Sequence, residues 1–85
     1  MNPYTVDWNQ DALSDLADIW LQASDRRAVT DAQARADQLL ADDPLGQGRH
    51  QAEGLYRLLV SPLVIFYSVD MARQSVEVSR VWYRP

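Results

Sequence analysis

The chain of 85 residues contains no cysteine, no lysine and only one histidine, His50. Without cysteine it forms no disulfide and has no thiol nucleophile, which fits a reducing cytosol and predicts a cytoplasmic protein. One histidine without cysteine disfavours a structural zinc site, and no residue pattern indicates a metal or another cofactor. No apolar run reaches the roughly 18 residues that a membrane-spanning helix needs, so no contact with a membrane is expected.

Length and charge set the next limits. The length predicts one domain over residues 1–85, and the hydrophobic content of 47% is enough for a folded core. The formal net charge is −4, and the acidic residues gather in the first half while five of the eight arginines lie after residue 43. This balance disfavours direct contact with nucleic acid, although the C-terminal half could accept an anionic partner. Solvation of helix surfaces explains the asymmetry equally well.

The first half predicts a strand and two helices. Alternation over residues 4–8 indicates a half-buried strand, and Asn9 is the expected N-cap of the helix that follows. The apolar stripe of that helix is expected in the core, and it comprises Leu13, Leu16, Ala17 and Trp20. The second helix starts either at Thr30, which forms a capping box with Gln33, or behind Asp25 as the cap. Its thinner stripe comprises Val29, Ala32, Ala36, Leu39 and Leu40.

The second half predicts three strands. Residues 44–54 hold all three glycines and are expected to form a loop, and strands follow over 55–60, 63–70 and 75–85. Both faces of the strand over 63–70 are apolar, which is typical of a central strand. We therefore expect an α+β domain of order β-α-α-β-β-β, with a two-helix hairpin on a mainly antiparallel sheet. The last strand could be a sheet edge, open to homodimerisation or to strand addition by a partner.

Five stretches of the sequence, in this order and spacing, carry a resemblance to a known family. They are "YTVDW", "DALSDLADIW", "LLADDPLGQG", "GLYRLLVSPLVIFYSVD" and "SVEVSRVWYRP". The chain resembles, over nearly its whole length, the RelE/ParE superfamily of toxins from type II toxin–antitoxin modules (plasmid stabilisation proteins). The resemblance implies a compact toxin that a cognate antitoxin neutralises by wrapping a segment over the sheet and helices. RelE-like members cut mRNA in the ribosomal A site, ParE-like members poison DNA gyrase, and many others have no assigned target.

The residues of this chain favour some branches of the superfamily over others. Cutting RNA by attack of a 2′-hydroxyl needs a base, an acid and cations around the phosphate. Ribosome-dependent members have a basic sheet face, whereas this chain has no lysine and has Val64 where such members carry an arginine. Arg57 comes one residue after the arginine of the family's "GLR" pattern, and a shift of one residue turns a side chain to the opposite face.

We therefore expect a toxin that works by binding a protein, either ParE-like or with an unassigned target, and not an enzyme. Two alternatives stay open. One is a metal-independent endoribonuclease that cuts mRNA on the ribosome. The other is a degenerate family member without toxicity. DNA gyrase and the ribosome are thus the candidate targets, beside a cognate antitoxin as the regulatory partner.

Candidate site residues come from the arginines and aromatics of the second half. The expected partner-binding residues are Arg57, Arg80, Trp82, Tyr83 and Arg84, because arginine beside aromatic residues is typical of contact hot spots. Arg80 is expected to share a face with Val78 and Trp82. If the chain is catalytic, the candidate catalytic residues are Arg57, Tyr67 and Arg84.

Each candidate also has a purely structural interpretation. Arg57 could form an ion pair with Asp70 or Glu77, Tyr67 could pack in the core with its hydroxyl satisfied, and Trp82 could cap the core edge.

Overall fold

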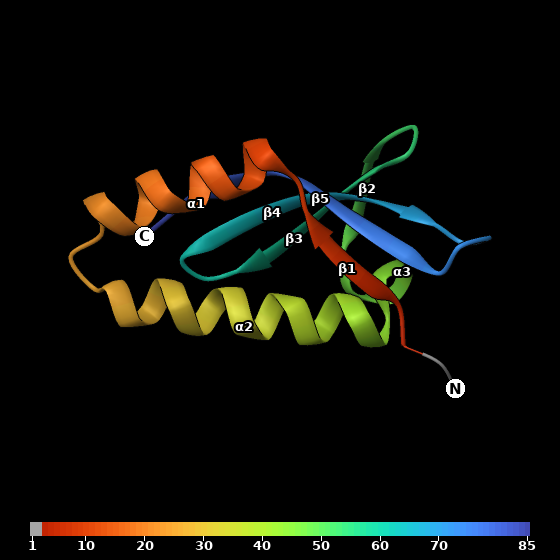
Figure 1. The fold of residues 1–85 in the computed structure, drawn as a ribbon, viewed down its shortest axis with the longest axis horizontal. Coiled ribbons are helices and arrows are strands. Elements are labelled where there is room, and N and C mark those ends of the chain that lie inside the picture. The colour runs from red at the N-terminus through yellow and green to blue at the C-terminus, as the bar shows by residue number, and fades with distance from the viewer. Residues whose placement is uncertain (1–2) are drawn as a thin grey trace.

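A five-stranded sheet forms the framework of the protein, for which a computed structural model describes residues 3–85 (Figure 1). The strands are β1 (Thr5–Trp8), β2 (Arg49–Ala52), β3 (Leu55–Val60), β4 (Leu63–Asp70) and β5 (Ser75–Tyr83). They lie in the order β1-β5-β4-β3-β2, and every neighbouring pair is antiparallel except the parallel pair of β1 and β5. Two long helices, α1 (Gln10–Gln22) and α2 (Arg26–Asp42), pack on one face, and a short α3 (Pro44–Gln47) follows. The expected α+β class, with a helix pair on a mainly antiparallel sheet, is confirmed.

Side-chain caps explain where the two long helices begin. The Asn9 side chain accepts a hydrogen bond from the Ala12 amide at 2.9 Å, as the sequence predicted. Asp25 caps α2 in the same way, by accepting from the Ala28 amide at 3.0 Å. The alternative start at Thr30 is wrong, because the Thr30 hydroxyl lies inside the helix and donates to the Arg26 carbonyl.

The segment from residue 44 to 54 is more ordered than a loop. It contains α3 and the strand β2, which pairs with β3, so four strands follow the helices and not three. The sequence hides β2 because all four of its residues are exposed and it lies at the sheet edge, so no apolar alternation marks it. Among the described residues, no helix is long and apolar enough to cross a membrane.

The core lies between the two long helices and one face of the sheet. β4 contributes Leu63, Ile65 and Tyr67, each fully buried, and its place as the third of five strands confirms the predicted central position. Of the stripe predicted for α1, Leu16 is buried as expected, whereas Ala17 is exposed and Leu13 and Trp20 are 45% and 42% exposed. The buried residues of α1 and its C-terminal cap are Ala12, Leu16, Ile19 and Ala23.

β5 lies between β1 and β4, so the expectation that the last strand forms a sheet edge is wrong for Ser75 to Val78, whereas β5 beyond Val78 has no strand on the β1 side. A β-bulge in the β4–β5 pairing places Phe66 opposite Arg80 but the next residue, Tyr67, opposite Val78. Val78 therefore points into the core with no exposed surface, whereas Trp82 is 60% exposed on the other face. The predicted common face for Val78, Arg80 and Trp82 is wrong, because the bulge changes the alternation between them.

Candidate functional site

The sheet face opposite α1 and α2, called the open face below, carries an apolar row across three strands. The row comprises Leu59 on β3, Val64 on β4 and Trp82 on β5, which are direct neighbours in the strand register. Leu59 and Trp82 are 58% and 60% exposed, while Val64 between them is buried. Phe66 extends the row, because its ring meets the Trp82 ring edge to face with the centroids 4.8 Å apart.

This apolar row borders a hollow of about 490 Å³, lined by Leu55, Phe66, Ser79, Arg80 and Trp82. A second hollow of about 400 Å³ lies towards β2 and is lined by Gln47, Arg49, Arg57, Leu58 and Leu59. The apolar hollow thus lies on the open face, and the basic hollow lies at the β2 side of β3, where its lining combines Arg49 and Arg57 of the open face with the core residue Leu58. Such a surface suits a protein segment with a large apolar side chain, because aromatic and arginine side chains dominate binding contacts.

Arg57 lies on this face between one positively charged residue and one uncharged residue. Across the strands it is opposite Arg49 on one side and Phe66 on the other. The expected ion pair of Arg57 with Asp70 or Glu77 does not form in the described structure. Asp70 instead lies 3.9 Å from the Arg73 guanidinium, and Glu77 accepts a hydrogen bond from the Asn9 side chain.

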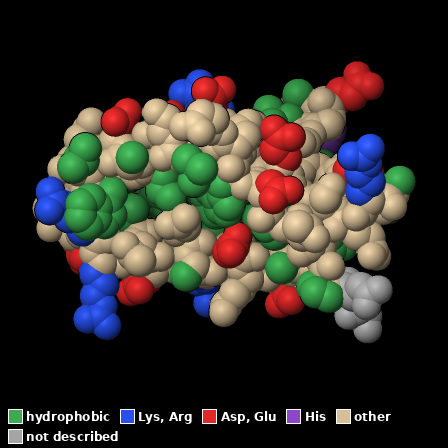
Figure 2. All heavy atoms as spheres, viewed as in Figure 1, with side chains coloured by type: hydrophobic (Ala, Val, Ile, Leu, Met, Phe, Trp, Pro, Cys, Tyr) green, Lys and Arg blue, Asp and Glu red, His purple; other side chains and the backbone are tan. Residues whose placement is uncertain are grey.

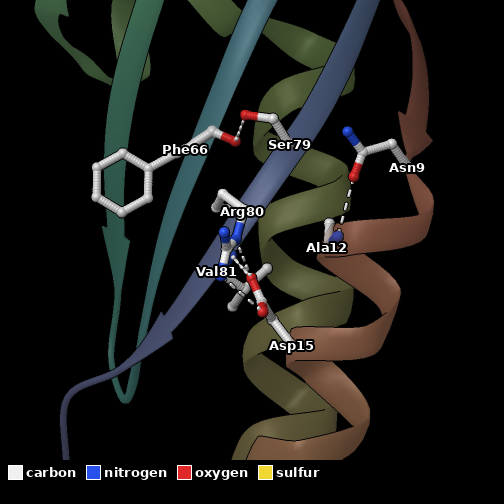
Figure 3. A network of polar contacts seen from close by, with 7 residues as sticks. All are labelled: Asn9, Ala12, Asp15, Phe66, Ser79, Arg80 and Val81. Atoms are coloured by element: carbon white, nitrogen blue, oxygen red, sulfur yellow. Dashed lines mark hydrogen bonds and ion pairs between the residues drawn. The ribbon is translucent and has the colours of Figure 1, made fainter.

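Arg80 is held by a carboxylate from α1. Asp15 accepts from the Arg80 Nε at 2.8 Å and from its terminal nitrogen at 3.2 Å, and it also accepts from the Val81 amide at 3.0 Å (Figure 3). Hydrogen bonding to Arg80 lowers the pKa of the Asp15 carboxyl against a smaller opposing effect of burial. Arg80 still has 58% of its side chain exposed and lines the apolar hollow, so its position is fixed but its surface is accessible.

Tyr67 lies on the helix-covered face, away from these residues. Its side chain is fully buried, and its hydroxyl donates a hydrogen bond to the Pro44 carbonyl at 2.5 Å. Burial raises the pKa of this hydroxyl to about 12. The contact fixes the chain at the start of α3, and a side chain at Gly48 would collide with the same hydroxyl and with the Arg57 carbonyl. Tyr67 is therefore a core residue with its hydroxyl satisfied, as its structural interpretation expected.

A second exposed apolar surface, called the helix groove below, lies between α1 and α2. Figure 2 shows apolar side chains gathered along the line where the two helices face each other. The groove measures about 480 Å³ and is lined mainly by Leu13, Leu16, Ala17, Trp20, Leu21 and Val29. The Arg26 guanidinium covers one end, since it stacks on the Trp20 ring at 4.6 Å and donates to the last carbonyls of α1.

Comparison with known proteins shows the family of the chain. Residues 6–84 match the family described as the ParE toxin of the type II toxin–antitoxin system parDE. The chain belongs to this ParE toxin family. A comparison with curated proteins finds no match.

Solved structures share the fold of this ParE-family chain. The RelBE2 toxin–antitoxin complex of Mycobacterium tuberculosis superposes with a TM-score of 0.81 at 25% identity, covering 99% of this chain and 94% of that one. The chromosomal ParDE system of P. aeruginosa gives 0.73 at 18% identity, covering 96% and 97%. The archaeal RelE–RelB complex of Pyrococcus horikoshii gives 0.71 at 13% identity, covering 96% of each chain. Both RelE and ParE toxins therefore share this fold.

The predicted site residues of this ParE-family toxin fall into separate places. Arg57, Arg80 and Trp82 come together on the open face. Tyr83 is half-buried against the core. Arg84 follows β5, where its backbone amide donates to the Pro62 carbonyl at 2.7 Å and its side chain is exposed.

Sequence reasoning missed two features of the candidate surfaces. It did not identify Leu55, Leu59 and Phe66 as part of the open face, and it assigned Leu13 and Trp20 to the core although they line the helix groove. A usable signal was present for the groove. α1 carries two apolar stripes, one through Leu16 and Ile19 and one through Leu13 and Trp20, and a helix needs only one of them to pack on a sheet.

Proposed function

We propose that this chain is a toxin that acts by binding a protein target through its open face, in the ParE-like manner, and that a cognate antitoxin neutralises it. The observation that carries the proposal is the apolar and aromatic centre of the open face. Leu59 and Trp82 are more than half exposed there, and the hollow beside Phe66 and Trp82 has room for a large side chain. Exposed aromatic clusters of this kind are typical of protein contacts.

The arrangement of titratable groups disfavours RNA cleavage. A nuclease of this size needs a general base and a general acid close to a cationic phosphate site. Tyr67 lies on the other face and its hydroxyl proton is directed to the Pro44 carbonyl. The His50 ring packs edge-on against the Tyr56 ring, at a centroid distance of 5.2 Å. Tyr56 is opposite both His50 and the buried Tyr67 in the strand register, so His50 lies on the helix-covered side of the sheet. Neither side chain therefore lies beside Arg57 on the open face.

The helix groove is the surface that we assign to the antitoxin. Similar structures from M. tuberculosis and P. horikoshii are complexes of a toxin with an antitoxin. In this chain the groove is apolar, elongated between two helices and exposed, which suits the apolar face of an added helix. The two helices also carry exposed aspartates, such as Asp18 on α1 and Asp31 on α2, which favour a partner with basic residues.

Controlled expression in the host organism tests the toxin assignment. We expect growth arrest with filamentation and induction of the DNA-damage response, which follow from inhibition of DNA gyrase, while mRNA ends stay unchanged. A matched pair of variants locates the surface. Trp82→Ser should weaken the arrest, whereas Met71→Ser should leave it unchanged, because Met71 is equally exposed but lies in the β4–β5 turn.

Each other outcome has a clear meaning. Rapid arrest of translation with mRNA cut within codons would assign the chain to the RelE-like nucleases and overturn binding as its mode of action. Absence of any growth effect at high expression would make it a degenerate member. The antitoxin part is tested separately, by co-expressing the product of the adjacent small open reading frame. We expect it to restore growth and to co-purify with the chain.

A further inference from the structure

Two arginines lie side by side on the open face, and residues 3–85 supply no counter-ion for them. Arg49 on β2 and Arg57 on β3 are direct neighbours in the antiparallel register, and both line the basic hollow. Neither forms an ion pair with any residue from 3 to 85. Like charges directly opposite each other destabilise a strand pair, so their side chains favour a bound anion. This holds in a chain whose formal net charge is −4.

The same register row continues into the apolar hollow. From β2 to β5 the row reads Arg49, Arg57, Phe66 and Arg80, with the side chains on one face. Arg80 already has Asp15 as its partner, so the unpaired positive charge lies at the β2–β3 side of the row. An anionic group bound there lies one to two strands away from the hollow beside Phe66 and Trp82, and neighbouring strands are about 4.8 Å apart.

From this arrangement we propose that the open face binds an extended segment of a partner protein that carries an acidic and a large apolar side chain two residues apart. The carboxylate pairs with Arg49 and Arg57, and the apolar side chain enters the hollow of Leu55, Phe66 and Trp82. Side chains at positions i and i+2 of an extended segment point the same way and are about 6.6 Å apart, which fits this spacing. The inference rests on the proposed function and names the chemistry of the partner at the same face.

Nucleic acid is the other source of an anion, and the rest of the face disfavours it. The half of the open face towards β1 forms a hollow of about 580 Å³, whose lining has one arginine, Arg73, against the three carboxylates of Asp7, Asp70 and Glu77. A phosphate backbone that crossed the face would meet these carboxylates. Leu59 and Trp82 next to the arginines would also stay exposed to solvent against a phosphate backbone, whereas a protein segment buries them.

A random 12-residue peptide library displayed on phage tests the proposal with the purified chain as bait. We expect enrichment of peptides with Asp or Glu two residues from Leu, Phe or Trp. Individual enriched peptides should lose about tenfold in affinity for the Arg49→Gln/Arg57→Gln double variant, because each partly exposed ion pair contributes a factor of several. The double variant Arg35→Gln/Arg73→Gln removes the same charge from α2 and from a turn, and it should bind like the unmodified chain.

Several results would overturn the proposal. These are a library without enrichment, enriched peptides that lack acidic residues, or equal affinity of the enriched peptides for both double variants. Binding of labelled single-stranded RNA tests the alternative ligand. Tight RNA binding that is lost only in the Arg49/Arg57 double variant would assign the face to nucleic acid. Circular dichroism confirms that each variant is folded. The peptide measurement uses purified protein, so its result does not depend on whether expression arrests growth. Failure of the proposed function would instead be seen in the expression experiment.

Discussion

The Asp15 carboxylate on α1 accepts a hydrogen bond from the backbone amide of Val81 on β5, at 3.0 Å. This contact satisfies a backbone amide that no neighbouring strand pairs with. β1 pairs with β5 only as far as Val78, so the following part of β5 has no strand on that side. The bidentate contact with Arg80 holds the carboxylate in position. A side chain thus replaces a strand at this edge, which protects it from pairing with another chain.

Asp15→Ala should therefore lower the free energy of unfolding by about 1 to 3 kcal/mol, because it leaves the Val81 amide without its partner. Urea unfolding measures the effect. Asp18→Ala is the control, since Asp18 is an exposed acidic residue on the same helix and should change the stability by less than about 0.5 kcal/mol. Equal losses in the two variants would show that the Asp15 contact contributes nothing beyond the charge.

The stability should also depend on pH through Asp15. Its pKa in the folded chain is lower than the ordinary value of 3.8, so the unfolded chain binds its proton more readily. The contribution of Asp15 is therefore complete above pH 3.8 and is lost as the pH falls through the lower folded pKa. The difference in unfolding free energy between the unmodified chain and Asp15→Asn should be constant at neutral pH and shrink below that value. A difference that stays constant in acid would contradict this linkage.

Tyr67→Phe separates a structural role from a catalytic one. The variant loses the hydrogen bond to the Pro44 carbonyl, which should lower the free energy of unfolding by about 1 kcal/mol. Growth arrest should persist at a temperature where the variant is folded, because the hydroxyl lies away from the open face. Tyr83→Phe serves as the control for removal of a tyrosine hydroxyl from the same sheet. Loss of arrest by a folded, stable Tyr67→Phe variant would return this residue to the list of catalytic candidates.

Local signals in the sequence predicted the parts of the fold that depend on single residues or short patterns. Asn9 predicted the start of α1, and the two apolar faces of residues 63–70 predicted a central strand. Features set by tertiary pairing were not predictable. The bulge at Ser79 changes the face of the residues after it, and β2 forms only because β3 offers an unpaired edge.

In the candidate surfaces too, single residues were predictable and their tertiary contacts were not. The sequence predicted Arg57, Arg80 and Trp82 as contact residues, and the structure gathers them on one face. It did not predict that Arg80 would be paired with Asp15, because the two residues are 65 positions apart and only the packing of α1 on β5 joins them. It also assigned Leu13 and Trp20 of α1 to the core in place of Ala12 and Ile19, since both pairs fit the helical period together with Leu16.

Arg84→Ala should weaken growth arrest more than Arg73→Ala. Both side chains are exposed and each substitution removes one positive charge, so the pair is matched in net charge. Arg84 follows β5 and lies two residues from Trp82 of the open face, whereas Arg73 lies in the β4–β5 turn beside Asp70. The readout is the expression level at which growth stops. Equal effects of the two substitutions would remove Arg84 from the contact surface.

The helix groove should be separable from the open face by substitution. Leu13→Ser and Trp20→Ser remove exposed apolar side chains from the groove, so each should weaken antitoxin binding by roughly tenfold, as truncation of an interface anchor does. Growth arrest should remain, and the antitoxin should rescue growth less well, because the open face is unchanged. Leu45→Ser is the control, since Leu45 is 38% exposed on α3 outside the groove. Calorimetric titration with the purified antitoxin gives the affinities. Unchanged affinity for both groove variants would assign the antitoxin to another surface.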